Sequence, residues 1–346
     1  MKFEAVTIKD IAKALGLSTS TVSRALRDSY EISPETKHMV LEYAKQINYR
    51  PNPIALSLKE RRSRSIGVIV SEIANVFFSQ IINGIESAAY DRGYNVIISQ
   101  SHESYEREVV NMDFLSSRSV DGFLISVSTE TKDFTHINDL HERGLPMVFV
   151  DRMVESIDTH KVIADNFKGA YDATMHLIKN GYKKIGHLAN SSYLSITKER
   201  VAGYRQALAD AKIEFSDDYL KYCLHGGLIY EEVEKAMNEF MNQKQMPEAI
   251  FASSDKLTTN SMRYCRANHI NIPDNLAMVG FSNLDLAELL SPSLTVVRQP
   301  AFEMGEVAAE LLINMIESKR PITTYETRVL PAELFIRESS ARKKKK

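Results

Sequence analysis

The chain has 346 residues, 43 Lys and Arg against 45 Asp and Glu, and two cysteines. This length suffices for a small domain and a body with two sizeable cores. No apolar run approaches the roughly 18 residues of a membrane span, and the first residues lack a signal-peptide core. We therefore expect a cytoplasmic protein with no membrane partner. The cysteines and the scattered histidines favour buried thiols over a disulfide or a metal site.

Charge is distributed unevenly along the chain. Residues 1–64 carry twelve Lys and Arg against seven Asp and Glu, residues 65–341 carry a net charge of −12, and residues 342–346 are all basic. A basic head on an acidic body predicts that the head binds nucleic acid. The terminal basic run is expected to be a solvated tail that adds non-specific attraction to phosphate.

Two short amphipathic helices joined by a tight turn are predicted at the start of the chain. Thr7 and Ser18 are the expected N-caps, and Gly16 can take the positive φ that ends the first helix. The apolar residues follow helical spacing: Ile8, Ile11, Ala12 and Leu15, then Val22, Ala25 and Leu26. The outward face of the second helix carries hydroxyls and arginines, which suit phosphates and base edges: Thr19, Ser20, Ser23, Arg24 and Arg27. A merely solvated face is the alternative, and the short turn disfavours it.

A third helix is predicted from Ser33-Pro34, with Val40, Tyr43, Ala44 and Ile47 facing inward. Three such helices make a minimal helix-turn-helix domain. Asn52-Pro53 then begins a segment of about two helical turns before a charge run, and a helix this short is not stable alone.

The order of these elements resembles the lactose-repressor (LacI-type) family of bacterial transcription regulators over nearly the full length. The resemblance rests on Asn48-Tyr-Arg-Pro-Asn52, Ala55-Leu-Ser-Leu-Lys59 and Ser65-Ile-Gly-Val-Ile69. It implies a hinge helix that folds on the operator, where both copies of a dimer wedge Leu58 into the minor groove. It also implies base reading by Thr19, Ser20 and Arg24. The residues expected at DNA are Thr7, Ser18, Thr19, Ser20, Thr21, Ser23, Arg24, Asn52, Ala55, Leu58 and Lys59.

The rest of the chain is predicted as two runs of alternating strands and helices. The first run has strands near residues 65–70, 95–99, 121–127 and 146–150, with helices near 77–92, 105–117 and 134–143. The second has strands near 161–164, 184–189, 220–224, 248–252 and 277–281, with helices near 167–179, 198–211, 230–242 and 257–268. A segment at 294–299, a helix at 303–317 and a strand at 333–337 complete the chain. We expect two doubly wound α/β lobes, like those of periplasmic binding proteins, with a ligand at the carboxyl ends of the strands.

This organisation predicts a headpiece at residues 1–51, a hinge helix and linker at 52–64, and a basic tail at 341–346. The first lobe is expected at 65–163 with 295–325, and the second at 164–294 with 326–340. The body has no glycine-rich phosphate loop and no G-x-S-x-G, so we predict neither an enzyme nor a cofactor. A free sugar-binding protein without a DNA role is the alternative, but it would need an export signal and no helix-turn-helix.

The resemblance also implies which residues bind the effector. Arg200 matches the arginine that family members aim at the effector, and its planar fork suits a carboxylate or vicinal hydroxyls. Asp151 and Asp255 each follow a strand, where a carboxylate either binds ligand hydroxyls or caps the next turn or helix. Phe77 and Phe78 either stack on an apolar ligand face or pack in the core.

Two further candidates lie near the end of the body. Gln299 lies on the segment that crosses back towards the first lobe. Its side chain amide either contacts the ligand or satisfies backbone groups of this connection. Ser282 stands where the family commonly has an acid, in Val279-Gly-Phe-Ser-Asn283, so the charge-assisted bond expected there is lost. Acidic or phosphorylated sugars therefore stay open beside neutral ones. We expect a homodimeric regulator, a repressor, that binds an inverted-repeat operator under the control of a sugar or sugar derivative.

Overall fold

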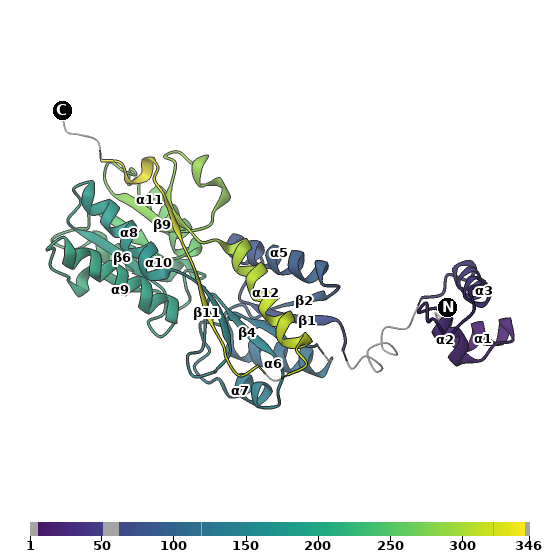
Figure 1. Cartoon of the computed structure of the whole chain (residues 1–346). Coiled ribbons are helices and arrows are strands. Elements are labelled where there is room, and N and C mark those ends of the chain that lie inside the picture. Colours follow the sequence, from purple (N-terminus) through teal and green to yellow (C-terminus); the bar gives the residue numbers. More distant parts are fainter. Residues whose placement is uncertain (1–5, 51–61, 119, 321, 343–346) are drawn as a thin grey trace. The chain divides into compact units, whose positions relative to one another are not determined.

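The computed structural model describes residues 6–50, 62–118, 120–320 and 322–342. The chain divides into two compact units, Met1–Arg64 and Ser65–Lys346 (Figure 1). We call the first the headpiece and the second the body. The predicted hinge contacts Asn52, Ala55, Leu58 and Lys59 lie outside the described residues, so they remain predictions.

The headpiece contains α1 (Ile8–Leu15), α2 (Thr19–Ala25) and α3 (Pro34–Gln46). Gly16 has φ of +65°, which ends α1 as predicted. Ser18 Oγ accepts a hydrogen bond from the Thr21 amide at 3.1 Å, which confirms the predicted cap of α2. One buried cluster holds the three helices together, formed by Ile11, Ala12, Val22, Ala25, Val40 and Ala44. Local capping and apolar spacing therefore suffice to place these helices.

The body contains two six-stranded sheets, in the orders β11-β5-β4-β3-β1-β2 and β12-β10-β9-β8-β6-β7. We call the lobes built on them the first and the second lobe. Every strand pair is parallel except β10 with β12. The first sheet has β1 (Ser65–Val70), β2 (Asn95–Gln100), β3 (Phe123–Ile125), β4 (Met147–Val150), β5 (His160–Ala164) and β11 (Thr327–Leu330). The second has β6 (Ile185–Ala189), β7 (Leu220–Tyr222), β8 (Ala249–Ala252), β9 (Ala277–Phe281), β10 (Thr295–Arg298) and β12 (Glu333–Phe335).

Helices cover both faces of each sheet, which explains the continuous apolar runs of the inner strands. In the first lobe α5 (Val76–Asp91) and α12 (Ala301–Glu317) pack on one face, and α6 (Tyr105–Ser117) and α7 (Thr135–Glu142) on the other. In the second lobe the faces carry α8 (Asn166–Lys179) with α9 (Ser195–Asp210), and α10 (Tyr230–Met241) with α11 (Asp255–Ala267). Short 3-10 helices lie at Asp217–Tyr219, Asp285–Glu288 and Glu338–Ser340. This architecture confirms the predicted fold class.

Glycines let one helix pair in each lobe approach backbone to backbone. A Cβ at Gly84 of α5 would lie 2.0 Å from the carbonyl oxygen of Phe302, and one at Gly305 of α12 would lie 2.1 Å from that of Ile81. In the second lobe, a Cβ at Gly203 of α9 would lie 2.2 Å from the carbonyl oxygen of Phe167 in α8. Figure 1 shows α12 beside α5, although α12 begins 210 residues after α5 ends. Any side chain at these glycines would push the helices apart.

Two predicted lobe boundaries differ from the structure. The segment 295–298, assigned to the first lobe, is β10 and pairs with β9 in the second sheet. The segment 327–330, assigned to the second lobe, is β11 and pairs with β5 in the first sheet. Three of the four β11 residues are exposed, so the strand lacks the apolar alternation that would reveal it. The chain therefore crosses between lobes after β5, after β10 and after β11.

The first basic residue of the tail, Arg342, is exposed as expected but has partners on the body. Arg342 donates from Nη1 to the carbonyl oxygen of Gly181, and its Cζ lies 5.0 Å from the centre of the Tyr182 ring. Residues 343–346 lie outside the described part. Within the described residues, no helix is both long and apolar enough to cross a membrane.

Candidate DNA-contact surface and effector site

The candidate DNA-contact surface is the outward face of α2. Thr19, Ser20 and Arg24 are exposed there. Arg24 Nη1 lies 3.1 Å from Glu31 Oε2, and both side chains are about half exposed. An ion pair of this kind contributes at most about 1 kcal/mol. Arg24 can therefore leave Glu31 for a base edge or a phosphate at little cost.

The remaining candidate hydroxyls of the headpiece already have local partners. Ser18 Oγ lies 2.7 Å from Ser20 Oγ and 2.8 Å from Thr21 Oγ1, besides capping α2. Thr7 donates from its amide and its hydroxyl to Asp10 Oδ2 at 2.8 and 2.7 Å. Ser23 Oγ accepts from Arg27 Nη2 at 2.5 Å. These side chains are held in place by short-range bonds and keep spare acceptor capacity.

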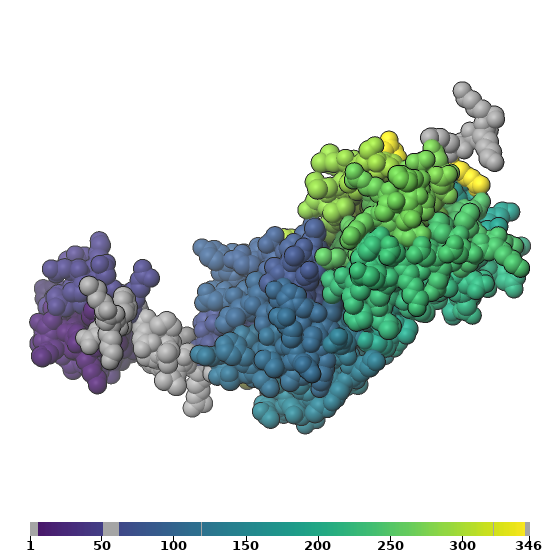
Figure 2. All heavy atoms as spheres, turned by 180° about the vertical axis from the view of Figure 1, so that it is seen from behind, coloured from purple at the N-terminus to yellow at the C-terminus, as the bar shows by residue number. Residues whose placement is uncertain are grey.

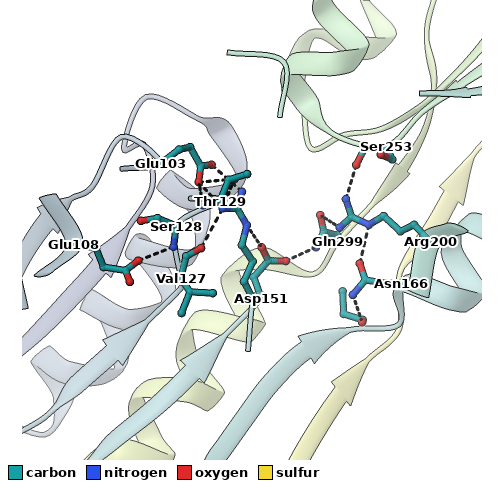
Figure 3. Close-up of polar contacts among 12 residues, drawn as sticks. Glu103, Glu108, Val127, Ser128, Thr129, Asp151, Asn166, Arg200, Ser253 and Gln299 are labelled. Carbon is teal, nitrogen blue, oxygen red and sulfur yellow. Dashed lines mark hydrogen bonds and ion pairs between the residues drawn. The ribbon is translucent and has the colours of Figure 1, made fainter. Parts of the chain in front are cut away.

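In the body, Arg200 is the centre of a buried polar cluster that we call the interlobe site (Figure 3). It lies in the second turn of α9, which begins at Ser195, three residues earlier than predicted. Arg200 Nε donates to Asn166 Oδ1 at 2.8 Å, and Nη1 donates to the carbonyl oxygen of Ser253 at 2.5 Å. Nη2 donates to Gln299 Oε1 at 3.4 Å. The interlobe site consists of these residues together with Asp151.

The guanidinium of Arg200 is charged but has only neutral acceptors. Its side chain is buried, and Cζ lies 3.7 Å from the centre of the Phe281 ring. Burial lowers the pKa of Arg200 to about 10, so the group stays protonated at neutral pH. A buried cation bonded to amide and carbonyl oxygens can exchange them for ligand oxygens without breaking an ion pair.

Gln299 joins the two lobes within the interlobe site. Its Nε2 donates to Asp151 Oδ1 at 3.3 Å, while its Oε1 accepts from Arg200. Asp151 follows β4 of the first lobe, and Arg200 belongs to α9 of the second. Burial raises the pKa of Asp151, opposed by the charges of Arg200 and Arg152. One amide thus connects a carboxylate on one lobe with a guanidinium on the other.

Asp255 and Ser282 lie together at a second polar contact in the second lobe. Ser282 Oγ donates to Asp255 Oδ1 at 2.5 Å, and the Asn283 amide donates to the same oxygen at 3.0 Å. The cap of α11 is Ser254, whose Oγ accepts from the Leu257 amide at 3.2 Å. Burial raises the pKa of Asp255 despite the bonds from Ser282 and Asn283.

Phe77 and Phe78 both belong to the core of the first lobe. Their rings meet edge to face with centroids 5.2 Å apart, and both are almost fully buried. Phe78 also lies 6.0 Å from Arg152 Cζ. The structure therefore places these rings in apolar packing, with Phe78 reaching the polar groups beside Asp151.

Sequence reasoning did not find three residues that the structure adds to this region. Asn166 bonds Arg200, and Arg152 is paired with Glu103 at 2.6 Å, both side chains being buried. The only local signal was that Arg152 directly follows Asp151. Glu103 lies 49 residues earlier in the chain, so spacing could not connect the two.

Several buried polar atoms near the ends of strands have no hydrogen-bond partner among the described residues. Ser126 Oγ follows β3, Asn190 Oδ1 and Ser191 Oγ follow β6, and Arg152 Nε follows β4. These strands end at the same edge of their sheets as the residues of the interlobe site. Buried donors and acceptors without partners indicate a bound ligand or water.

Other side chains connect the lobes around this site. Lys256 Nζ lies 3.3 Å from Glu72 Oε2. Asn283 Nδ2 donates to Gln80 Oε1 at 2.8 Å. Figure 2 shows the first lobe, mainly blue, meeting the second lobe, in green, along one boundary.

Comparison with known proteins identifies the class. The family model for bacterial regulatory proteins of the lacI family matches residues 7–52. The model for periplasmic binding proteins and the sugar-binding domain of the LacI family matches residues 63–337. Together these models cover the headpiece and nearly all of the body.

The chain belongs to the LacI family of bacterial regulatory proteins. It is therefore a DNA-binding transcriptional regulator with an effector-binding body, not an enzyme.

Named relatives agree with this assignment. The chain is 32% identical to the HTH-type transcriptional repressor PurR of Vibrio campbellii, over 96% of this chain and 98% of that one. It is also 32% identical to the HTH-type transcriptional repressor CytR of Escherichia coli, over 97% and 96%. The CelR–cellobiose complex is similar with a TM-score of 0.71 and 29% identity, over 96% and 99%. The lac repressor dimer bound to operator shares the fold, with a TM-score of 0.81 and 22% identity, over 98% and 100%.

Proposed function

We propose that the chain is a repressor that acts in the cytoplasm, where its DNA target lies, and that a neutral carbohydrate bound at the interlobe site controls its operator affinity. The observation that carries this proposal is the bridge from Asp151 through Gln299 to Arg200. A ligand placed there contacts both lobes at once. The ligand therefore stabilises the angle between the lobes at which it makes its best contacts with both.

The chemistry of the site favours a ligand with several hydroxyls. Arg200 and Gln299 offer donors, and Asp151 and Asp255 offer acceptors, which matches the mixed character of a hydroxyl. The buried carboxylates of Asp151 and Glu103 and the partly buried carboxylate of Asp255 outnumber the two guanidiniums, Arg200 and Arg152, which favours a neutral sugar over an anionic one. Solved relatives fit this class, since CelR carries cellobiose and a LacI family regulator of Enterococcus faecium, 27% identical with a TM-score of 0.70, carries ribose.

On the headpiece, we propose that Thr19, Ser20 and Arg24 read bases. Thr7, Ser18, Thr21 and Ser23 then contact phosphates, and of these Thr21 and Ser23 are less exposed than the proposed base readers. The hinge contribution of Leu58 and its neighbours Asn52, Ala55 and Lys59 rests on the family resemblance alone. A dimer presents each surface twice, so the operator should be an inverted repeat with an easily kinked central step.

A thermal-shift screen of the full-length protein tests the effector assignment. The panel contains ribose, cellobiose, glucose, glucose 6-phosphate and adenosine. A neutral sugar at a hundred times its Kd should stabilise the body by about 2.7 kcal/mol. The same sugar should change operator affinity in fluorescence anisotropy. Stabilisation by glucose 6-phosphate alone, or by no member of the panel, would contradict the proposed ligand class.

Selection of binding sites from random duplex DNA tests the operator assignment. Enrichment of a palindromic motif is the expected outcome. A single half-site without a repeat would exclude the proposed symmetric mode of binding.

A further inference from the structure

Asp151 occupies a strained turn at the end of β4. Its φ is +65°, and the Arg152 amide donates to the carbonyl oxygen of Val150 at 2.8 Å. This bond closes a three-residue turn centred on Asp151, a conformation that is rare and strained for a residue with a side chain. The Asp151 amide donates to the carbonyl oxygen of Val162 at 2.9 Å, which fixes only one side of the turn. Other contacts must hold the second side.

The Arg152 side chain supplies those contacts. Its Nη1 donates to Glu103 Oε2 at 2.6 Å, and Nη2 donates to Glu103 Oε1 at 2.8 Å. Nη1 also lies 3.1 Å from the carbonyl oxygen of Val127 and 3.2 Å from Thr129 Oγ1. A two-pronged bond of this kind fixes the plane of a guanidinium as well as its position. The remaining nitrogen, Nε, is then directed towards Asp151 Oδ2, 3.9 Å away.

Glu103 is itself held firmly at a second strained point. Its φ is +64°, and that of the preceding His102 is +51°. The Thr129 amide and hydroxyl both donate to Glu103 Oε2 at 2.8 Å. Burial opposes ionisation of Glu103, but Arg152 and Thr129 outweigh it and lower its pKa. The carboxylate is therefore charged at neutral pH and fixed in position.

We propose that Glu103 is a positioning residue that acts through Arg152 to hold the Asp151 turn and to direct the Asp151 carboxylate at the effector. The inference rests on the proposed function in one respect, that Asp151 is a ligand contact. Glu103 has no role of its own in contacting the effector. Removing its charge releases the Arg152 fork, and the strained turn then relaxes.

Glu108 offers a matched control within the same lobe. It is fully buried, and it accepts hydrogen bonds from the Ser128 amide at 2.6 Å, Thr131 Oγ1 at 2.9 Å and His136 Nε2 at 3.0 Å. Like Glu103, it fastens the loop that follows β3. None of these bonds goes to Arg152, so Glu108→Gln should disturb the Asp151 turn much less than Glu103→Gln does.

Hydrogen–deuterium exchange of the full-length protein tests the hold on the turn without any ligand. In Glu103→Gln we expect the amides of Asp151 and Arg152 to exchange about tenfold faster than in the parent, with no change in the second lobe. Arg152→Gln should give the same acceleration, and the double variant no more than either single one. Unchanged exchange in Glu103→Gln would overturn the proposal, as would equal acceleration in Glu108→Gln.

If Glu103→Gln does not fold, a milder variant can be used in the same exchange experiment. Thr129→Val removes one donor to the same carboxylate and should accelerate exchange at the turn about threefold. No acceleration in Thr129→Val would then count against the proposal.

Calorimetry with ribose and cellobiose as probes tests the effector side. Whichever probe binds the parent should bind Glu103→Gln about tenfold more weakly and Glu108→Gln unchanged. If the turn loosens while the affinity stays constant, the directing role towards the effector is refuted. If neither these probes nor glucose binds the parent, the carbohydrate assignment fails, while the exchange experiment still decides whether Glu103 holds the turn.

Discussion

The headpiece and the body arrange their functional side chains in opposite ways. On α2 these side chains are exposed, and the partner of Arg24 lies only seven residues away in the chain. In the interlobe site they are buried, and Asp151 reaches a partner 148 residues away. An exposed side chain with a short-range partner contributes little to folding, whereas a buried one with distant partners contributes much. The DNA-contact surface should therefore tolerate substitution, and the interlobe site should not.

The sharpest test of this difference is Arg200→Ala. Loss of the guanidinium leaves Asn166, Gln299 and the Ser253 carbonyl without their donor, so we expect the body to lose about 3 kcal/mol of unfolding free energy. Urea unfolding followed by circular dichroism measures this. Arg205→Ala, on the same helix but half exposed, should cost less than about 1 kcal/mol. Similar losses in both variants would remove the distinction between buried and exposed sites.

The body should also be more sensitive to acid because of His187. This fully buried ring stacks on Phe251 at 4.7 Å, and burial lowers its pKa to about 4. The unfolded chain binds a proton at this histidine below pH 6.5 or so, and the folded body does not, so stability falls as the pH falls from there towards 4. We expect His187 to account for about 2 kcal/mol of the loss between pH 7.5 and 5.

Urea unfolding of His187→Asn at both pH values isolates this contribution. The variant is less stable at pH 7.5, but its stability should change less with pH than that of the parent. An identical pH dependence in the two proteins would mean that His187 has the same charge in the folded and the unfolded chain. His187 would then not be the cause of the acid sensitivity.

On the headpiece, Arg24→Ala should weaken the selected operator by about 1.5 kcal/mol, since a base-reading arginine is lost while its ion pair with Glu31 contributes little. Anisotropy titrations with the operator and with a random duplex measure this. The thermal unfolding of the headpiece should stay the same. Equal losses on both duplexes would show that Arg24 contacts the backbone instead of a base.

The smallest effect concerns the ion pair between the lobes, Lys256 with Glu72. Both groups are partly exposed, so a double-mutant cycle with Lys256→Met and Glu72→Gln should give a coupling of about 0.5 kcal/mol that falls with added salt. Lys221 with Glu239, 3.2 Å apart within the second lobe, is the matched pair. Only the pair between the lobes should alter the effector dependence of operator binding. The same change from both pairs would exclude a specific role in lobe closure.

Local chemistry explains why much of this structure could be predicted. The ends of α1 and α2 follow from Gly16 and Ser18, whose effect extends over only a few residues. The family resemblance placed Arg200. It could not supply Asn166 or Glu103, because such partners are brought together by the sheet and not by spacing. The strand β11 was not predicted for a related reason, since its exposed residues carry no pattern that distinguishes a strand from a loop.

The late return of the chain to the first lobe determines the order in which the protein can be completed during synthesis. The core that begins with Ile66 also contains Met304, Leu312 and Leu330. A nascent chain can form the headpiece as soon as its first residues leave the ribosome, but the first lobe stays open until the whole second lobe has been made. A chain released early would keep a finished DNA-contact domain on an unfinished body. Such a product would lack the part that responds to an effector, because the first lobe needs α12 and β11 to complete its core.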